Sequence, residues 1–242
     1  MFTPHLKKID SSILEKRIEK VRKKYDQPGM AAAVIQGDTI TAYAAAGTIV
    51  YNTTDPVDVQ TSRFHIGSTT KGITATLIAM LVEEGKLSRE TTLKEIFPEM
   101  VMRKEYEEVT IHHLFTSTGG IVPMQDDEKE PWARTLFYDI PFHYTDPGEQ
   151  RLALTKAALN LEPVVTVGKT FYYSNTGWGI LGTIAEKVTG ESFEVLMQKR
   201  VFDALGMTSA KIGGWPASPT EPYQPRGHYC RILNPYTKEY HF

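Results

Sequence analysis

The feature that most constrains the fold is a long apolar run in the first half of the chain. Residues 72–87, "GITATLIAMLVEEGKL", place apolar or small side chains on all sides of a helix, and not in a stripe along one side. Threonines and a pair of glutamates interrupt the run, and Lys71 precedes it, so it is not expected to span a membrane. A helix of this kind must be covered on most sides by other elements. We therefore expect it to lie at the centre of a globular fold.

Two elements are predicted ahead of this helix. Apolar residues recur at helical spacing from Ile9 to Tyr25, with a capping box that starts at Ser12, and predict an amphipathic surface helix. Residues 30–47, "MAAAVIQGDTITAYAAAG", hold two short apolar runs on either side of Gly37 and Asp38 and predict a β-hairpin. The many alanines of the hairpin suggest that it packs closely under a helix.

Helical patterns continue after the apolar run and end before a proline-rich segment. Three later stretches have helical periodicity, at residues 149–161, 177–190 and 191–207. The last segment holds several prolines with little periodicity, which is typical of loop or extended chain. The order of elements predicts one α+β domain. Its expected parts are an N-terminal helix and hairpin (1–60), a helical part (61–210) and an extended proline-rich segment (211–242).

Charge and cysteine content restrict the partners and the location. The formal net charge is −2, from 27 basic and 29 acidic residues, which gives no broad positive field for nucleic acid or an anionic membrane. The single cysteine, Cys230, cannot form an internal disulfide, and residues 1–20 have no apolar core of signal-peptide length. We expect a cytoplasmic protein that binds neither nucleic acid nor membrane.

A serine and a lysine stand three positions apart in "STTK", where the apolar helix begins. Three positions are about one helical turn, so Ser68 and Lys71 are expected on one face. A serine hydroxyl needs a base within hydrogen-bond reach, and a lysine desolvated by an apolar helix can take part in proton transfer. The N–H of Ser68 could hold an oxyanion, and Gly67 would let a substrate approach the backbone closely. The alternative is a helix cap followed by a lysine whose stem packs on the helix.

A second pair, Tyr173 and Asn175, stands two positions apart in "FYYSNTGWGILG", directly before a helix. Extended or turn backbone would point both side chains the same way. A phenol is a second proton-transfer group, and a carboxamide can donate to a substrate carbonyl while it accepts from a lysine ammonium. The alternative is a loop tyrosine followed by a helix cap.

Glycine patterns in the same region resemble nucleotide-binding motifs, but their contexts do not fit. Gly177, Gly179 and Gly182 match the dinucleotide fingerprint, yet no clear strand that ends in an acidic residue follows, and tight helix packing is favoured. The "GKT" at Gly168 lacks the first glycine of a phosphate loop, because position 163 is proline. Nucleotide binding is therefore not expected.

Two further clusters resemble metal sites, and both are interpreted as structural. Adjacent His112 and His113 point in different directions, and no second cluster follows at ligand spacing, so they are expected to cap or flank a helix. The acidic residues between Asp126 and Glu130 lack the glycine and the spacing of a calcium loop and are expected to form a solvated loop.

Taken in series, long stretches of the chain resemble the serine β-lactamase and penicillin-binding-protein superfamily, in particular its class C β-lactamase-like branch with the family VIII carboxylesterases. They occur in family order: "QPGMAAAVIQGDTITAYAAAG", "FHIGSTTKGITATLIAMLVEEGKL", "VTIHHLFTSTGG" and "FYYSNTGWGILGTIAEKVTG". The resemblance implies a serine β-lactamase/transpeptidase-like α+β fold with an antiparallel sheet packed against helices. It implies Ser68 as the acylated nucleophile, Lys71 and Tyr173 as proton-transfer partners and Asn175 as a substrate-positioning group. No metal or organic cofactor is implied.

The activity that the resemblance implies is that of a serine hydrolase. Such an enzyme would form a covalent acyl-enzyme from an ester, a β-lactam or a small amide and pass the acyl group to water. Which of Lys71 and Tyr173 acts as the base is left open. The alternative is a catalytically impaired or non-catalytic β-lactamase-like binding protein.

A third family motif, Lys-Thr-Gly or His-x-Gly on a late strand, is not found at its expected place. His65, Ile66 and Gly67 have suitable letters but precede the serine, and "KT" at Lys169 is followed by Phe171. The resemblance stops before the C-terminal third of the family domain, and a lone hairpin is only marginally stable. We therefore expect a truncated product, a fragment, or one half of a split enzyme whose sheet a second chain completes.

Overall fold

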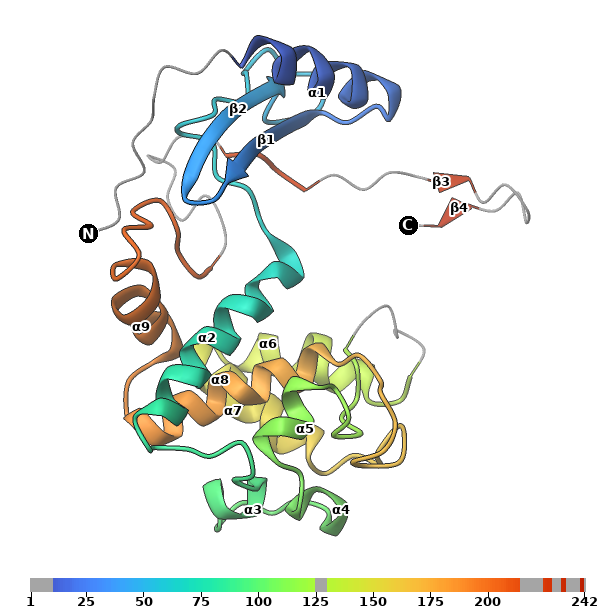
Figure 1. The fold of residues 1–242 in the computed structure, drawn as a ribbon. Helices are drawn as coiled ribbons and strands as arrows, with labels where there is room; N and C mark the ends of the chain where they lie inside the picture. The colour runs from blue at the N-terminus through green and yellow to red at the C-terminus, as the bar shows by residue number, and fades with distance from the viewer. Residues whose placement is uncertain (1–10, 125–129, 214–223, 228–231, 234–239, 242) are drawn as a thin grey trace. The chain divides into compact units, whose positions relative to one another are not determined.

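The computed structural model describes residues 11–124, 130–213, 224–227, 232–233 and 240–241. Contacts between residues divide the chain into two compact units, one of residues 1–67 and 205–242 and the other of residues 68–204. An antiparallel hairpin lies in the first unit and a group of helices in the second, so the fold is α+β, as predicted (Figure 1). Our division into one domain with parts at 1–60, 61–210 and 211–242 stays a prediction beside this grouping.

The predicted hairpin is present in the first unit. Strand β1 (Gly29–Gln36) pairs with strand β2 (Thr39–Gly47) in antiparallel register, with an irregularity between Val34 and Ile35. The strands are joined by the two residues Gly37 and Asp38, and Gly37 has a φ of +62°, which glycine adopts without steric cost. The turn residues therefore fix the register of the pair.

Helix α1 (Ser12–Lys24) packs on this hairpin, as the alanines suggest (Figure 1). Ile18 of the helix and Ala44 of β2 are buried, because small strand side chains let the helix come close. The capping box predicted at Ser12 is wrong. The cap position is Ser11, which makes no side-chain hydrogen bond to the helix, and its Oγ instead accepts from the Tyr43 N–H over 3.1 Å. A contact with the neighbouring strand has replaced the local cap.

The C-terminal segment contributes short extended pieces to the first unit. Strand β3 (Ile232–Leu233) pairs with strand β4 (Tyr240–His241) in a second antiparallel sheet. The Arg63 N–H donates to the side-chain oxygen of Gln224 over 2.8 Å, and the Arg226 N–H donates to the Ile49 carbonyl over 3.1 Å. In the described residues of this segment, these pieces agree with the loop or extended chain that the sequence predicts. Cys230 and the acidic stretch 125–129 lie outside the described residues.

The apolar run forms helix α2 (Thr70–Glu83), which is preceded by the 3-10 turn η1 (Gly67–Thr69). One side of α2 is buried, and it packs on later helices of the second unit. The other side is exposed, along a row formed by Gly72, Thr76, Ala79 and Glu83. The cover is therefore less complete than predicted. Glycine, threonine and alanine in the run suit an exposed side as well as a buried one, so the pattern alone did not distinguish them.

The remaining elements of the second unit are short helices around two longer ones. They are α3 (Leu93–Ile96), α4 (Lys104–Glu107), α5 (Ile111–Phe115), the π-helical turn η2 (Thr135–Asp139), α6 (Ile140–His143), α7 (Pro147–Ala158), α8 (Asn175–Thr189), α9 (Phe193–Leu196) and the π-helical turn η3 (Met197–Phe202). The three predicted helical stretches correspond to α7, α8 and the pair of α9 and η3.

Helices α7 and α8 pack closely because α8 carries glycines at the contact. A Cβ on Gly179 would lie 3.1 Å from Leu154 Cδ2, and one on Gly182 would lie 3.1 Å from Arg151 Cδ. The glycines of "GWGILG" therefore serve helix packing, which confirms that interpretation of the motif.

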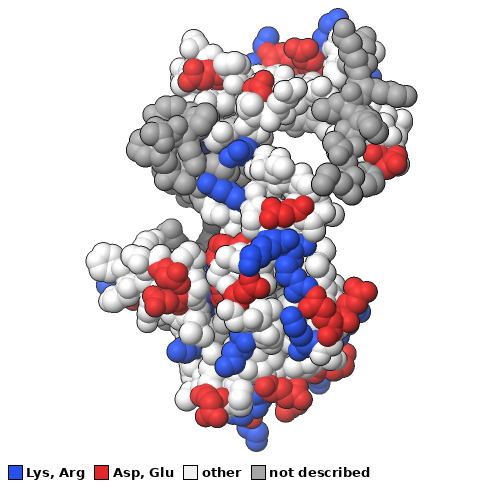
Figure 2. All heavy atoms as spheres, turned by 90° about the vertical axis from the view of Figure 1, so that its left-hand side faces the viewer, with Lys and Arg blue, Asp and Glu red and all other residues white. Residues whose placement is uncertain are grey.

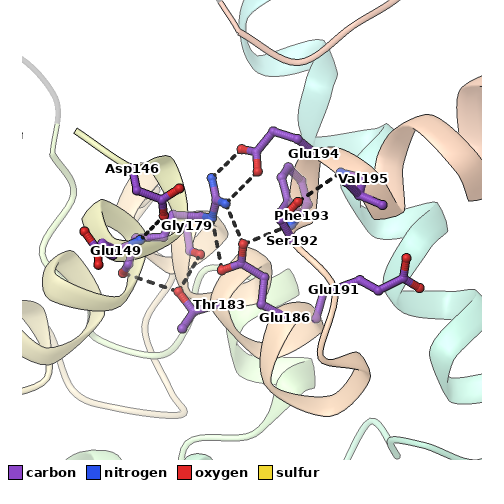
Figure 3. A network of polar contacts seen from close by, with 12 residues as sticks. Asp146, Glu149, Gly179, Thr183, Glu186, Glu191, Ser192, Phe193, Glu194 and Val195 are labelled. Atoms are coloured by element: carbon purple, nitrogen blue, oxygen red, sulfur yellow. Dashed lines mark hydrogen bonds and ion pairs between the residues drawn. The ribbon is translucent and has the colours of Figure 1, made fainter. Parts of the chain in front are cut away.

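An ion-pair network joins the same two helices to α9 (Figure 3). The guanidinium of Arg151 on α7 pairs with Glu186 on α8 at 2.6 Å and with Glu194 on α9 at 2.8 Å. Beneath it, the hydroxyls of Thr155 and Thr183 share a buried hydrogen bond of 2.8 Å. Burial alone would lower the pKa of Arg151, but the bonds to both glutamates outweigh it and raise that pKa. The network fixes α8 on two sides.

Two of the short helices, α3 and α5, begin with capping boxes, and one of these boxes uses a histidine. Thr110 and His113 form a capping box at α5, in which the His113 Nδ1 accepts from the Thr110 N–H over 3.2 Å. Thr92 and Glu95 do the same at α3. The expectation that the histidine pair caps or flanks a helix is confirmed.

Surface charges are mixed on the face drawn in Figure 2, where acidic and basic side chains alternate. In the part of the chain that the structure describes, no helix is both long and apolar enough to cross a membrane. Within the same residues, no cluster of three or more His, Cys, Asp or Glu side chains is arranged to hold a metal ion.

Candidate active site

Ser68 and Lys71 are brought together by the turn that leads into α2. Ser68 lies in the turn η1, and Lys71 is in the first turn of α2. The Nζ of Lys71 donates to the Oγ of Ser68 over 3.0 Å. Ser68 is exposed, whereas Lys71 is half-buried. The spacing in "STTK" thus places both side chains on one face of the helix start.

Tyr173 and Asn175 reach the same pair of side chains. The Tyr173 hydroxyl donates to the Oγ of Ser68 over 2.7 Å, and the Asn175 Oδ1 accepts from the Nζ of Lys71 over 2.7 Å. The Nζ of Lys71 also lies 4.8 Å from the centroid of the Tyr173 ring, within the range of a cation–π contact. All four residues belong to the second unit. We call this cluster the Ser68 site.

Local backbone geometry explains why Tyr173 and Asn175 act together. Ser174 between them is extended, with φ −134° and ψ 113°, so its two neighbours point to the same side. Its hydroxyl caps α8 by accepting from the Gly177 N–H over 3.0 Å and donates to the Val122 carbonyl over 2.8 Å. Ser174 is buried, so the cap holds Tyr173 and Asn175 against a fixed part of the unit.

Residues 122–124 complete this support, and sequence reasoning did not identify them. The Asn175 N–H donates to the Pro123 carbonyl over 2.8 Å, and the Asn175 Nδ2 donates to the Met124 carbonyl over 3.0 Å. Every residue type has a backbone carbonyl, so no letter of the sequence marks these contacts.

The environment of the site favours the ionised form of its phenol. A hydrogen bond with Lys71 and then the bond with Ser68 lower the pKa of Tyr173, while burial opposes this only weakly. The cation above the ring acts in the same direction. Tyr173 can therefore exist as phenolate at a lower pH than an isolated tyrosine.

Gly67 is the one predicted site residue outside the second unit. Its φ is +52°, its N–H donates to the Nδ1 of His65 over 3.3 Å, and a Cβ at this position would meet nothing within 4 Å. The space beside the Gly67 backbone is therefore open. The approach of a substrate to this backbone stays a prediction.

Chemically, the Ser68 site supplies a hydroxyl with two proton-transfer groups in contact. The oxygen of Ser68 accepts from both Lys71 and Tyr173 in the structure as it stands. Loss of a proton from either neighbour would turn that neighbour into an acceptor for the serine proton. The geometry therefore suits activation of a serine nucleophile.

A cavity of about 480 Å³ in the second unit lies apart from this chemistry. Its walls include Phe97, Met100, Leu152 and Lys156, and none of the four residues of the Ser68 site lines it.

Comparison with known proteins identifies relatives of this chain. A family model described as Beta-lactamase matches residues 14–229. A beta-lactamase of Escherichia coli strain K12 is 30% identical over 210 residues, which cover 86% of this chain and 49% of that protein. A lovastatin esterase of Penicillium rubens is 28% identical over 163 residues, which cover 61% of this chain and 39% of that protein.

A solved structure shows the same fold. The octameric penicillin-binding protein homologue from Pyrococcus abyssi superimposes with a TM-score of 0.63 at 29% identity, over 82% of this chain and 44% of that one. The chain thus spans about half the length of the curated beta-lactamase that it matches. With the family model covering most of its length, the chain belongs to the beta-lactamase family, within the superfamily of serine β-lactamases and penicillin-binding proteins.

Proposed function

We propose that the chain is a serine hydrolase that forms a covalent acyl-enzyme at Ser68. The observation that carries the proposal is the pair of short contacts to one serine oxygen, 3.0 Å from Lys71 Nζ and 2.7 Å from the Tyr173 hydroxyl. A serine in contact with two proton-transfer groups is the arrangement that nucleophilic catalysis requires.

The reaction has two steps. In the first, the Oγ of Ser68 attacks the substrate carbonyl carbon while its proton passes to Lys71 or Tyr173 in the deprotonated form. The tetrahedral intermediate then collapses, the leaving group departs with a proton from the same pair, and an ester remains on Ser68. In the second step, water attacks this ester and gives up a proton to the pair. The bond between the acyl carbon and the Oγ of Ser68 then breaks, the pair returns a proton to Oγ, and the acid is released. Asn175 holds Lys71 in place and positions the substrate. No metal or organic cofactor enters either step.

The substrate class is an ester, a β-lactam or a small amide. Support comes from relatives whose names include a beta-lactamase and an esterase, both of which act on carbonyl groups of this kind. The backbone N–H of Ser68, at the start of α2, is the donor that we assign to the oxyanion, and Gly67 is the place where the substrate passes the backbone. We place the enzyme in the cytoplasm, because its single cysteine, Cys230, suits a reducing compartment.

A second chain that completes the sheet is part of this proposal. Strand β1 carries no charged residue, and among the described residues it pairs only with β2. Val34 and Ile35 are exposed on it. An uncharged, unpaired strand edge accepts a further strand readily. Native mass spectrometry of the protein isolated from its own cells should show a bound companion chain; a monomer of 27.2 kDa would count against it.

The alternative function is non-catalytic binding through the same site. It applies if the Ser68 N–H is the only donor to the oxyanion, since loss of an oxyanion donor typically lowers the rate by about 10²- to 10³-fold. A hydrolase turns over its substrate, whereas a binding protein does not.

Hydrolysis of a chromogenic short-chain ester tests the proposal. We expect turnover by the wild type, none by Ser68→Ala, and wild-type turnover by Thr69→Ala, which removes the neighbouring exposed hydroxyl of the same turn. Equal rates for the wild type and Ser68→Ala in folded protein would favour the binding function.

A further inference from the structure

The Ser68 site needs one particular end of the Asn175 carboxamide to face Lys71. The oxygen of a carboxamide accepts and its nitrogen donates, but the two ends are similar in size and the terminal torsion has a broad, two-fold preference. Oδ1 accepts from Lys71 over 2.7 Å, and Nδ2 donates to the Met124 carbonyl over 3.0 Å. Turning the group over would set NH₂ against an ammonium and oxygen against oxygen, so both bonds would be lost.

We propose that Met124 is a positioning residue, whose backbone carbonyl fixes the Asn175 carboxamide with Oδ1 toward Lys71. The proposal rests on the function proposed above and adds to it a residue that does not itself touch the reacting atoms. The ammonium form of Lys71 can only donate and the Met124 carbonyl can only accept, so together they favour one orientation of the amide and disfavour the other.

The position of this carbonyl is set by a run of three backbone contacts. The Val122 carbonyl accepts from the Ser174 hydroxyl over 2.8 Å, and the Pro123 carbonyl accepts from the Asn175 N–H over 2.8 Å. The Met124 carbonyl then accepts from the side chain of Asn175. Successive carbonyls thus bind successive groups at the start of α8, which leaves the third carbonyl little freedom.

Met124 turns its carbonyl toward Asn175 by adopting an uncommon backbone conformation. Its φ is +51°, in the left-handed region that non-glycine residues rarely occupy. Such a conformation persists only where its surroundings enforce it, and β-branched side chains tolerate it least. The role is therefore carried by the backbone of Met124, and it should survive loss of the side chain but not a change in backbone preference.

Three substitutions at position 124 distinguish a role of the backbone from a role of the side chain. Met124→Gly removes the side chain and keeps the conformation easy; Met124→Leu keeps a side chain of similar size without β-branching; Met124→Val opposes the positive φ. We expect the rate of Ser68 acylation by a chromogenic short-chain ester to be unchanged in the first two and about 10- to 100-fold lower in Met124→Val. Loss in Met124→Gly equal to that in Met124→Val would overturn the proposal.

A double-mutant cycle distinguishes positioning from general damage. Asn175→Ala removes the group through which Met124 acts, so adding Met124→Val to it should cause no further loss of acylation rate. Additive losses would contradict the proposal, since they would show that Met124 acts by another route.

A measurement on the unreacted protein keeps the test independent of catalysis. The side-chain amide of Asn175, assigned by its absence in Asn175→Ala, should show one proton slowed in exchange with water in the wild type and in Met124→Gly. The slow proton should be lost in Met124→Val. If no slow proton exists in the wild type, Met124 does not position the amide. If the wild type shows it but Ser68 does not react, the proposed function fails while the role of Met124 stands.

Discussion

The side-chain contacts of Ser68 decide whether the site can react. The serine oxygen accepts from Lys71 and from Tyr173, so neither neighbour takes the serine proton until one of them has lost its own. Lys71 and the bond with Ser68 lower the pKa of Tyr173, which makes its phenolate available below the usual tyrosine range. We therefore expect a rise in pH to activate the site.

The pH dependence of acylation tests which neighbour is the base. Because the base must be deprotonated, Tyr173 as the base predicts an acylation rate that rises with pH and levels off below about pH 10, the ordinary pKa of tyrosine. If Tyr173 is the base, Tyr173→Phe should lose this rise and about 10²- to 10⁴-fold in rate, whereas Lys71 as the base would preserve the rise. A rate independent of pH in the wild type would contradict Tyr173 as the base. The measurement is a stopped-flow pH profile of acylation by a chromogenic short-chain ester.

A second tyrosine ties stability to pH. Tyr106 is fully buried, its hydroxyl donates to the Gly120 carbonyl over 3.4 Å, and burial raises its pKa. Above about pH 10 the unfolded chain loses this proton and the folded chain keeps it, so stability should fall by about 1.4 kcal/mol per pH unit through Tyr106 alone. Tyr106→Phe should show a smaller fall.

Urea denaturation at pH 7 and at pH 10.5 measures this difference. The matched control is Tyr138→Phe, because Tyr138 is 59% exposed, and this variant should keep the wild-type dependence on pH. Equal dependence in Tyr106→Phe and wild type would show that the phenol is not buried in solution.

Sequence reasoning was effective for side chains with local spacing and failed for backbone groups. Ser68 with Lys71, and Tyr173 with Asn175, are short-range pairs whose geometry follows from one helical turn and from one extended residue. The Met124 carbonyl joins the site across 51 positions, and a carbonyl has no signature in the sequence.

At the scale of elements, the second unit depends on one cation that joins three helices. Arg151 of α7 binds carboxylates of α8 and α9, and its side chain is 17% exposed (Figure 3). Removing it would leave Glu186 and Glu194 close together and partly buried without a counter-charge.

Substitution of this arginine should therefore destabilise the unit. We expect Arg151→Met to lower the free energy of unfolding by about 2 to 3 kcal/mol, less than a fully buried pair because part of the network is solvated. Arg134→Met is the control, since the Arg134 side chain is 85% exposed in its pair with Asp139, and should change it by less than about 1 kcal/mol. Thermal denaturation of both variants measures these changes. Equal losses of unfolding free energy in the two variants would contradict this role of Arg151.

Elements were predictable where local chemistry dominates. Gly37 and Asp38 set the β1–β2 turn, and the glycines of α8 set its packing on α7. The cap of α1 was not predictable, because Ser11 bonds to Tyr43, 32 positions away. The exposed side of α2 was missed for a related reason: small residues carry little information about which side is covered.

At the scale of the whole molecule, the chain spans about half of the beta-lactamase that it resembles, and the Ser68 site lies entirely in one of its two units. Family membership followed from several motifs in series, which no single short motif could establish. The companion chain expected from the sequence stays a proposal, because strand pairing between chains depends on residues outside this sequence.

The site of covalent reaction tests most directly whether Ser68 is the nucleophile. After incubation with a fluorophosphonate, intact-mass spectrometry and peptide mapping should find one adduct per folded chain, located on Ser68, and far slower labelling in Lys71→Ala. An adduct on another residue, or a folded chain that stays unlabelled, would contradict the claim that Lys71 and Tyr173 make this serine a nucleophile.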